Sequence, residues 1–180
     1  MSTPVRTVKN SLDQVLRWAS VVLFATLVLI VVWQVVTRSL GSASTWSEEA
    51  ARYTFVWLGF VASALVFSEK GHIAVDFLVR KQPPKGQLAT AVLAQLAILA
   101  LALLILVWGG VRASAGAWNQ QLSSLPATVG GMYTVMPMTG AIIAFFAIYH
   151  LVEMVQGKEP PYAPDEGVGG DVPEPGEVNL

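Results

Sequence analysis

The sequence WASVVLFATLVLIVVWQVVT, residues 18–37, is a long apolar run without a single charged side chain. At a rise of about 1.5 Å per helical residue, such a run covers the roughly 30 Å hydrocarbon core of a bilayer. Three further apolar segments follow at about residues 50–68, 88–108 and 132–152, and none carries a charge in its middle. The sequence therefore predicts an all-α integral membrane protein with four transmembrane helices.

The composition agrees with a chain that lies mostly in the membrane. Of its 180 residues, 54% are hydrophobic and 13% are charged, which leaves room for short connections and no sizeable soluble domain. We expect residues 1–156 to form one four-helix membrane domain. Residues 157–180 are rich in proline, glycine and acidic residues, and we expect them to form a disordered cytoplasmic tail.

The predicted spans lack the groups on which transport or catalysis depends. Ion and proton carriers place ionisable side chains or broken helices at mid-membrane, and haem proteins would need histidines in the middle of a span. The chain has no cysteine for a disulfide, a thiolate metal site or a nucleophile. It also lacks the short motifs of hydrolases, metalloproteases and nucleotide-binding proteins. We expect no enzymatic activity, no cofactor, no metal site and no transport by this chain alone.

The distribution of basic residues predicts the orientation. Positively charged segments stay on the cytoplasmic side of the membrane. In this sequence they precede the first span and follow the second, at Arg6, Lys9, Arg17, Lys70, Arg80, Lys81 and Lys85. We therefore expect both termini inside and the first and third loops outside. Signal-peptide cores have about 7–15 apolar residues, so an uncleaved first span is favoured over a signal peptide cut near residues 42–44.

Capping patterns predict where the first two helices begin. Ser11 and Thr45 are each followed three residues later by Gln or Glu, which is the capping-box pattern. Glu48, Glu49 and Arg52 then share one face of the second helix. Two interpretations of these three charges remain open: they cap the helix and pair with one another, or they contact a partner.

Two further patterns concern packing and the membrane surface. Small residues four apart, at Gly59 and Ser63, Gly109 and Ala113, and Gly140 and Ala144, favour close approach of helices. After the second span, His72, Asp76 and Arg80 repeat every four residues beside an apolar stripe, which predicts a short amphipathic helix at the cytoplasmic interface. Two potential ligands, His72 and Asp76, are too few for a metal site.

A resemblance to a known family rests on motifs on both sides of the second span. The first runs from Arg38 to Gly59 and contains WSEEAARY at residues 46–53, and the second is HIAVD at residues 72–76. Leu125-Pro126 and YTVMP at residues 133–137 add to the match. These residues resemble the small permease subunit of tripartite ATP-independent periplasmic (TRAP) transporters, the DctQ-like family.

The resemblance implies a multi-pass subunit of the bacterial cytoplasmic (inner) membrane that scaffolds a large, DctM-like permease. It also implies an extracytoplasmic binding protein that delivers an organic acid, a dicarboxylate or sugar acid, for symport driven by a cation gradient. Membrane lipids are expected partners, and nucleic acids are not. The residues expected at an interface with the large subunit or the binding protein are Arg38, Trp46, Glu48, Glu49, Arg52, Tyr53 and Trp57. The alternatives are an independent four-span carrier and a structural tetraspan protein with unrelated partners.

Overall fold

A computed structural model of the chain describes residues 3–42, 44–69 and 84–155. Its helices are α1 (Thr3–Ser39), α2 (Thr45–Ser68), α4 (Pro84–Leu101), the π-helical η1 (Ala102–Gly109), α5 (Gly110–Gly116), α6 (Val129–Tyr133) and α7 (Val135–Val155). The predicted interfacial helix, with His72 and Asp76, and the predicted tail at 157–180 lie outside the described residues.

Among the described residues, four helical stretches are long and apolar enough to cross a membrane: Thr7–Ser39, Thr45–Ser68, Gly86–Gly116 and Val129–Met154. The third combines α4, η1 and α5, and the fourth combines α6 and α7. Each contains one of the predicted apolar segments and extends beyond it. The prediction of an all-α membrane protein with four transmembrane helices is confirmed.

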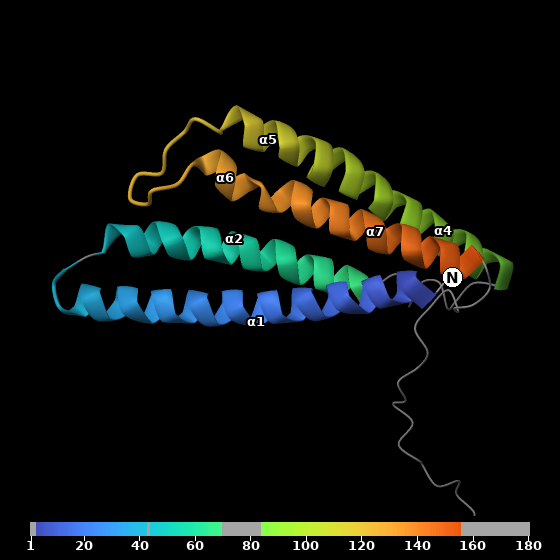
Figure 1. The fold of residues 1–180 in the computed structure, drawn as a ribbon, viewed down its shortest axis with the longest axis horizontal. Helices are drawn as coiled ribbons and strands as arrows, with labels where there is room; N and C mark the ends of the chain where they lie inside the picture. The colour runs from blue at the N-terminus through green and yellow to red at the C-terminus, as the bar shows by residue number, and fades with distance from the viewer. Residues whose placement is uncertain (1–2, 43, 70–83, 156–180) are drawn as a thin grey trace, which may run out of the picture.

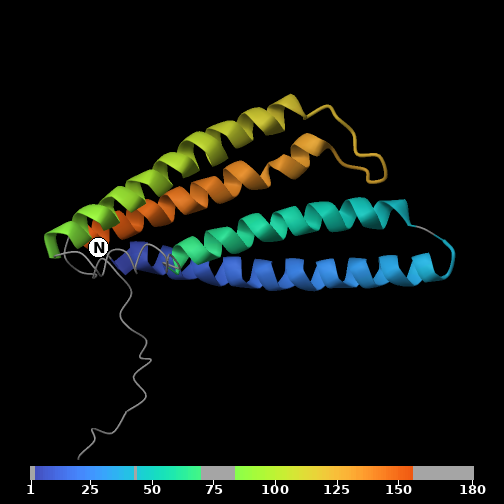
Figure 2. The ribbon, with the colours of Figure 1, turned by 180° about the vertical axis from the view of Figure 1, so that it is seen from behind.

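The four long helices form two hairpins (Figure 1). In the first hairpin α1 packs along α2, and in the second the α4–η1–α5 helix packs along α6 and α7. The hairpins meet through α2 and α7, close together where both of these helices end (Figures 1 and 2). We call this the terminal end. The hairpins spread apart toward residues 40–44 and 117–128, which we call the loop end.

The buried core follows the contact between the two hairpins. Apolar side chains from both hairpins form it, namely Leu16, Val61, Ala64, Ala102, Val135, Ile143, Ala144 and Phe146. Phe146 is the largest fully buried side chain. Most of α1, by contrast, turns apolar side chains away from the bundle, as expected for a helix that faces lipid or another subunit.

The predicted start of the first helix is wrong, whereas the second helix begins at Thr45 as predicted. Ser11 lies inside α1, which begins at Thr3 and is about 55 Å long at 1.5 Å per residue. This exceeds the bilayer core, so the polar first turns extend beyond it. Thr45 is the first residue of α2, and the N-cap is Ser44, whose side chain makes no capping bond. Instead, Ser47 Oγ donates to the Ser44 carbonyl at 2.9 Å.

Glycines bring the second hairpin together tightly. A Cβ on Gly140 would lie 2.6 Å from Leu106 Cβ, and one on Gly110 would lie 2.8 Å from Pro137 Cδ. The small-residue prediction is therefore confirmed at Gly140, whereas the contact falls on Gly110 rather than Gly109. The π-helical turn of η1 accounts for the shift, because it holds more residues per turn and moves the contact face along the sequence.

The fourth membrane-length stretch is broken near its start. Thr128 caps α6 by accepting from the Gly131 N–H at 3.1 Å, and the helix ends at Tyr133. Pro137 follows in the first turn of α7, where a residue without an N–H costs no intrahelical hydrogen bond. This break turns backbone groups of α6 toward the first hairpin.

Candidate functional site

The motif at residues 46–57 occupies the first turns of α2, and its side chains divide between two faces. Glu49, Tyr53 and Trp57 recur every four residues and point toward the second hairpin, where each has neighbours from it. Glu48 and Arg52 lie on the opposite, exposed face. The helical repeat thus separates residues that the sequence had placed in one group.

Glu49 fastens the loop between the third and fourth helices to α2. Its carboxylate accepts from the backbone N–H of Ser124 at 2.7 Å and from that of Ser123 at 3.2 Å. The loop is also closed on itself, because the Leu122 N–H donates to the Ala127 carbonyl at 3.0 Å. One interpretation from the sequence was that Glu48, Glu49 and Arg52 pair with one another. In the structure Arg52 pairs with Glu48, whereas the Glu49 carboxylate accepts hydrogen bonds from the loop amides.

Trp57 joins the hairpins through a hydrogen bond within the membrane-length helices. Its indole Nε1–H donates to the Met132 carbonyl of α6 at 3.0 Å. The end of α6 at Tyr133 makes this carbonyl available. In a hydrocarbon environment a polar group without a partner is costly, so the indole and the carbonyl stabilise each other's position.

Tyr53 lies between these two connections and lines a cleft. The cleft has a volume of about 200 Å³ and is partly open, with walls from both hairpins and the loop: Leu23, Ala50, Tyr53, Thr54, Trp57, Leu125 and Met132. Its lining is mainly apolar.

The outward face of α2 continues from the charged residues into an apolar stripe. Arg52 and Glu48 form a pair at 3.6 Å, with side chains 68% and 67% exposed; exposed pairs of this kind contribute about 0–1 kcal/mol. Further along this face of α2, toward the terminal end, lie four exposed residues, Phe55, Gly59, Ser63 and Val66. A Cβ on Gly59 would meet nothing within 4 Å. Trp46 and Arg38, the remaining two residues of the predicted interface, are exposed at the loop end.

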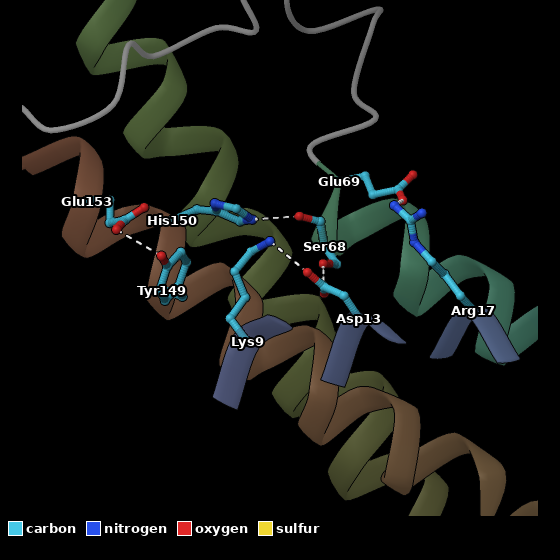
Figure 3. Close-up of polar contacts among 8 residues, drawn as sticks. All are labelled: Lys9, Asp13, Arg17, Ser68, Glu69, Tyr149, His150 and Glu153. Atoms are coloured by element: carbon cyan, nitrogen blue, oxygen red, sulfur yellow. Dashed lines mark hydrogen bonds and ion pairs between the residues drawn. The ribbon is translucent and has the colours of Figure 1, made fainter. Parts of the chain in front are cut away.

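A polar cluster at the terminal end was missed by the sequence analysis (Figure 3). Asp13 accepts from Lys9 Nζ at 2.8 Å and from Ser68 Oγ. His150, 3% exposed, places Nε2 at 3.2 Å from the Ser68 carbonyl. Because a carbonyl only accepts, Nε2 carries the proton of this hydrogen bond.

The cluster connects α1, α2 and α7 at the terminal end, where the hairpins converge. An ion pair between Arg17 and Glu69 lies beside it (Figure 3). The spacing of Lys9 and Asp13, one helical turn apart, was the only signal for it in the sequence. Within the described ranges, no group of three or more His, Cys, Asp or Glu is placed to hold a metal ion. The hydrogen bonds of Ser68 with Asp13 and His150 join α2 to α1 and α7.

Comparison with known proteins gives a family and several relatives. Residues 27–157 match the family model described as tripartite ATP-independent periplasmic transporters, DctQ component. The sialic acid TRAP transporter small permease protein SiaQ of Vibrio cholerae is 27% identical over 157 residues, 85% of this chain and 88% of that protein. A putative TRAP transporter small permease protein of Haemophilus influenzae is 26% identical over 153 residues, 84% of this chain and 94% of that protein.

A third relative is much longer than this chain. The sialic acid TRAP transporter permease protein SiaT of Haemophilus influenzae is 28% identical over 101 residues, which are 56% of this chain and 16% of that protein.

Proposed function

The chain belongs to the DctQ family of tripartite ATP-independent periplasmic transporter components, and from that premise we propose that it scaffolds a large permease subunit during uptake of an organic acid. It is a transporter subunit of the bacterial inner membrane with four membrane-length helices, and its relatives are permease subunits rather than enzymes. The proposal concerns how this subunit contacts its partner.

The long relative supports a direct partnership with a larger permease. In SiaT, the segment similar to this chain is a small part of one much longer permease protein. Two proteins that work side by side are often joined in one chain in a relative, and the joined form keeps them adjacent. A separate small subunit would have to obtain the same adjacency by packing its helices against the large one.

The outward face of α2 is the surface we assign to that contact. Gly59 and Ser63 lie four residues apart on it, and small residues at this spacing allow two helix backbones to approach closely. Ser63 Oγ donates to the Gly59 carbonyl at 2.7 Å, so its hydroxyl needs no partner from outside. The Glu48–Arg52 pair lies at the loop end of the same face and would set the register of the partner helix.

The predicted orientation places the loop end on the outer side of the membrane. With both termini inside, the loop end would face outward, toward a binding protein that delivers the substrate. Trp46, Glu48 and Arg52 are exposed there. We propose an organic acid as the substrate class and a cation gradient as the driving force; the Vibrio cholerae relative is named a sialic acid transporter subunit.

The open space at Gly59 is the observation that carries this proposal, and two matched substitutions test it. Gly59→Leu would add a side chain where nothing in the described chain lies within 4 Å of the Cβ. Gly116→Leu does the same on α5 of the other hairpin. We expect Gly59→Leu to lower co-purification of the large permease at least about tenfold, a loss of about 1.4 kcal/mol, and uptake with it. Gly116→Leu should leave both unchanged.

Equal recovery of the large permease with both variants would contradict the proposed face. Proteoliposomes that contain this chain alone provide the second test. We expect no uptake of an organic acid by them, because the middle of the spans carries no ionisable group. Uptake by the chain alone would support the alternative of an independent carrier.

A further inference from the structure

The third membrane-length stretch, Gly86–Gly116, carries a single charged residue, Arg112. The only acidic residue between positions 84 and 155 of the sequence is Glu153, which lies near the end of α7 at the terminal end. Arg112 takes part in none of the ion pairs formed among the described residues. No acidic side chain of the described chain therefore balances this cation.

The Arg112 side chain is exposed on α5 and lies over the ring of Trp108. Its guanidinium carbon is 4.9 Å from the centre of that ring, and Trp108 is itself 61% exposed. An indole attracts a cation through its ring face, whereas the five N–H donors of arginine lie in the plane of the guanidinium. The contact with Trp108 thus leaves in-plane donors available for an anion. The surface beyond is open, since a Cβ on Gly116 would meet nothing within 4 Å.

The position of Arg112 along the helix matches the height of lipid phosphates. The stretch Gly86–Gly116 has 31 residues, so Leu101 lies at its middle. Arg112 follows Leu101 by eleven residues, which is about 16 Å along a helix. Half of the hydrocarbon core measures about 15 Å. With Leu101 near the middle of the bilayer, the guanidinium reaches the level at which hydrocarbon ends and phosphates begin.

An exposed apolar surface leads from Arg112 toward the middle of the helix. Ala100, Leu104 and Trp108 precede it at intervals of four residues, and all three are exposed. A phospholipid joins an apolar acyl chain to a phosphate, and arginine binds phosphate through paired N–H donors. An acidic side chain of another protein would carry the same charge, but such groups are rare on membrane helices, whereas phosphates are present all around the helix at this height. The occupant that fits both the charge and the apolar surface is therefore a lipid.

We propose that Arg112 and Trp108 form a binding site for an anionic phospholipid in the leaflet at the loop end. The phosphate accepts hydrogen bonds from the guanidinium, and one acyl chain lies along Trp108 and Leu104. An anionic headgroup is preferred over a zwitterionic one because only the anionic headgroup brings a net negative charge to the unbalanced cation. This site goes beyond the proposed scaffolding role and does not depend on it, since it consists of residues of the second hairpin only.

Trp108 serves as the reporter in the experiment that tests this site. The chain has six tryptophans; Trp57 is kept, the exposed tryptophans other than Trp108 are replaced by phenylalanine, and a variant with Trp57 alone gives the background emission. The protein is placed in phosphatidylcholine nanodiscs that contain a small fraction of phosphatidylglycerol brominated on its acyl chains. Bromine quenches tryptophan emission on contact, so the quenching measures the affinity of the Trp108 surface for phosphatidylglycerol relative to phosphatidylcholine. We expect a preference of about fivefold for phosphatidylglycerol, the attraction typical of one basic residue at an anionic membrane surface.

Two matched controls separate the site from the general lipid surface. Arg112→Gln removes the charge from an exposed side chain and should make the affinities for the two lipids equal at Trp108. Trp33 is a second reporter, 52% exposed on α1 and without a basic residue within four positions of it. With Trp33 in place of Trp108 as the exposed tryptophan and with Arg112 present, we expect equal affinities for the two lipids.

Four results would overturn the proposal. The first is an equal affinity for the two lipids at Trp108 when Arg112 is present, and the second is a preference that Arg112→Gln does not reduce. The third is a preference at Trp33 as large as that at Trp108, which would show a general attraction of the protein for anionic lipid. The fourth is loss of the quenching of Trp108 when the large permease is added, because a protein surface rather than a lipid would then cover Arg112.

Discussion

Replacing Gly140 by alanine tests the tight packing of the second hairpin. The added Cβ would lie 2.6 Å from Leu106 Cβ and 3.1 Å from the Val107 backbone nitrogen. Carbon atoms in ordinary contact are about 3.5–4.0 Å apart, so α7 and η1 would have to separate by roughly 1 Å. Inserting a methylene into a packed core typically costs about 1–3 kcal/mol.

Gly59→Ala is the matched control. Both substitutions remove a glycine from a helix interior, and each gains about 0.5–1 kcal/mol of helical propensity. At Gly59 a Cβ meets nothing within 4 Å. The difference between the two variants therefore isolates the packing cost, and we expect Gly140→Ala to be less stable than Gly59→Ala by about 1–3 kcal/mol.

The assay is reversible unfolding of the full chain in mixed micelles, titrated with SDS and followed by circular dichroism. We expect Gly140→Ala to unfold at a lower SDS fraction than the wild-type chain and Gly59→Ala at an equal or higher one. A Gly140→Ala variant as stable as Gly59→Ala would refute the close approach of α7 to η1.

Two further predictions concern the connections at the loop end. Trp57→Phe removes the donor to the Met132 carbonyl, and we expect a loss of about 1 kcal/mol in the same unfolding assay; unchanged stability would show that this hydrogen bond does not join the hairpins. Glu49→Ala should raise amide exchange at Ser124 at least about tenfold, since bonds to charged acceptors contribute about 1.5–3 kcal/mol. Glu48→Ala, on the outward face, should leave that exchange unchanged, and equal effects of the two would contradict the assignment.

The four membrane-length helices were predictable because hydrocarbon imposes a simple rule. A segment must be about 20 residues long, apolar throughout and helical to cross it, and the run at 18–37 satisfies this rule without any tertiary contact. Helix starts were less predictable. The capping pattern at Ser11 is satisfied in the sequence, yet α1 continues back to Thr3, and an ion pair between Lys9 and Asp13, one turn apart, spans the predicted start.

The division of the motif into two faces required the structure. Spacing alone put Glu48, Glu49 and Arg52 on one side of α2, because Arg52 lies four residues after Glu48 and three after Glu49. The position of the loop decides between them: its Ser123 and Ser124 amides reach Glu49. Nothing in the sequence shows where a distant loop will dock, and the same reason hid the contact of Trp57 with α6.

Packing glycines were predictable in kind but not in position. Gly140 contacts the neighbouring helix as its spacing indicated, whereas η1 moves the contact from Gly109 to Gly110. A π-helical turn has no reliable sequence signal and changes which residues face a neighbour. The terminal cluster around Asp13 was hidden for a related reason, since Ser68 and His150 reach it only when the hairpins converge.

Site-specific cross-linking tests the proposed contact with the large permease most directly. The chain has no cysteine, so one cysteine can be introduced at a time without a background. With a short bifunctional maleimide in native membranes, we predict that Ser63→Cys on the outward face of α2 cross-links to a cysteine-scanned helix of the large permease. Ala115→Cys, on the exposed side of α5, should not. Cross-linking from Ala115→Cys but not from Ser63→Cys would contradict the account and place the partner on the other hairpin.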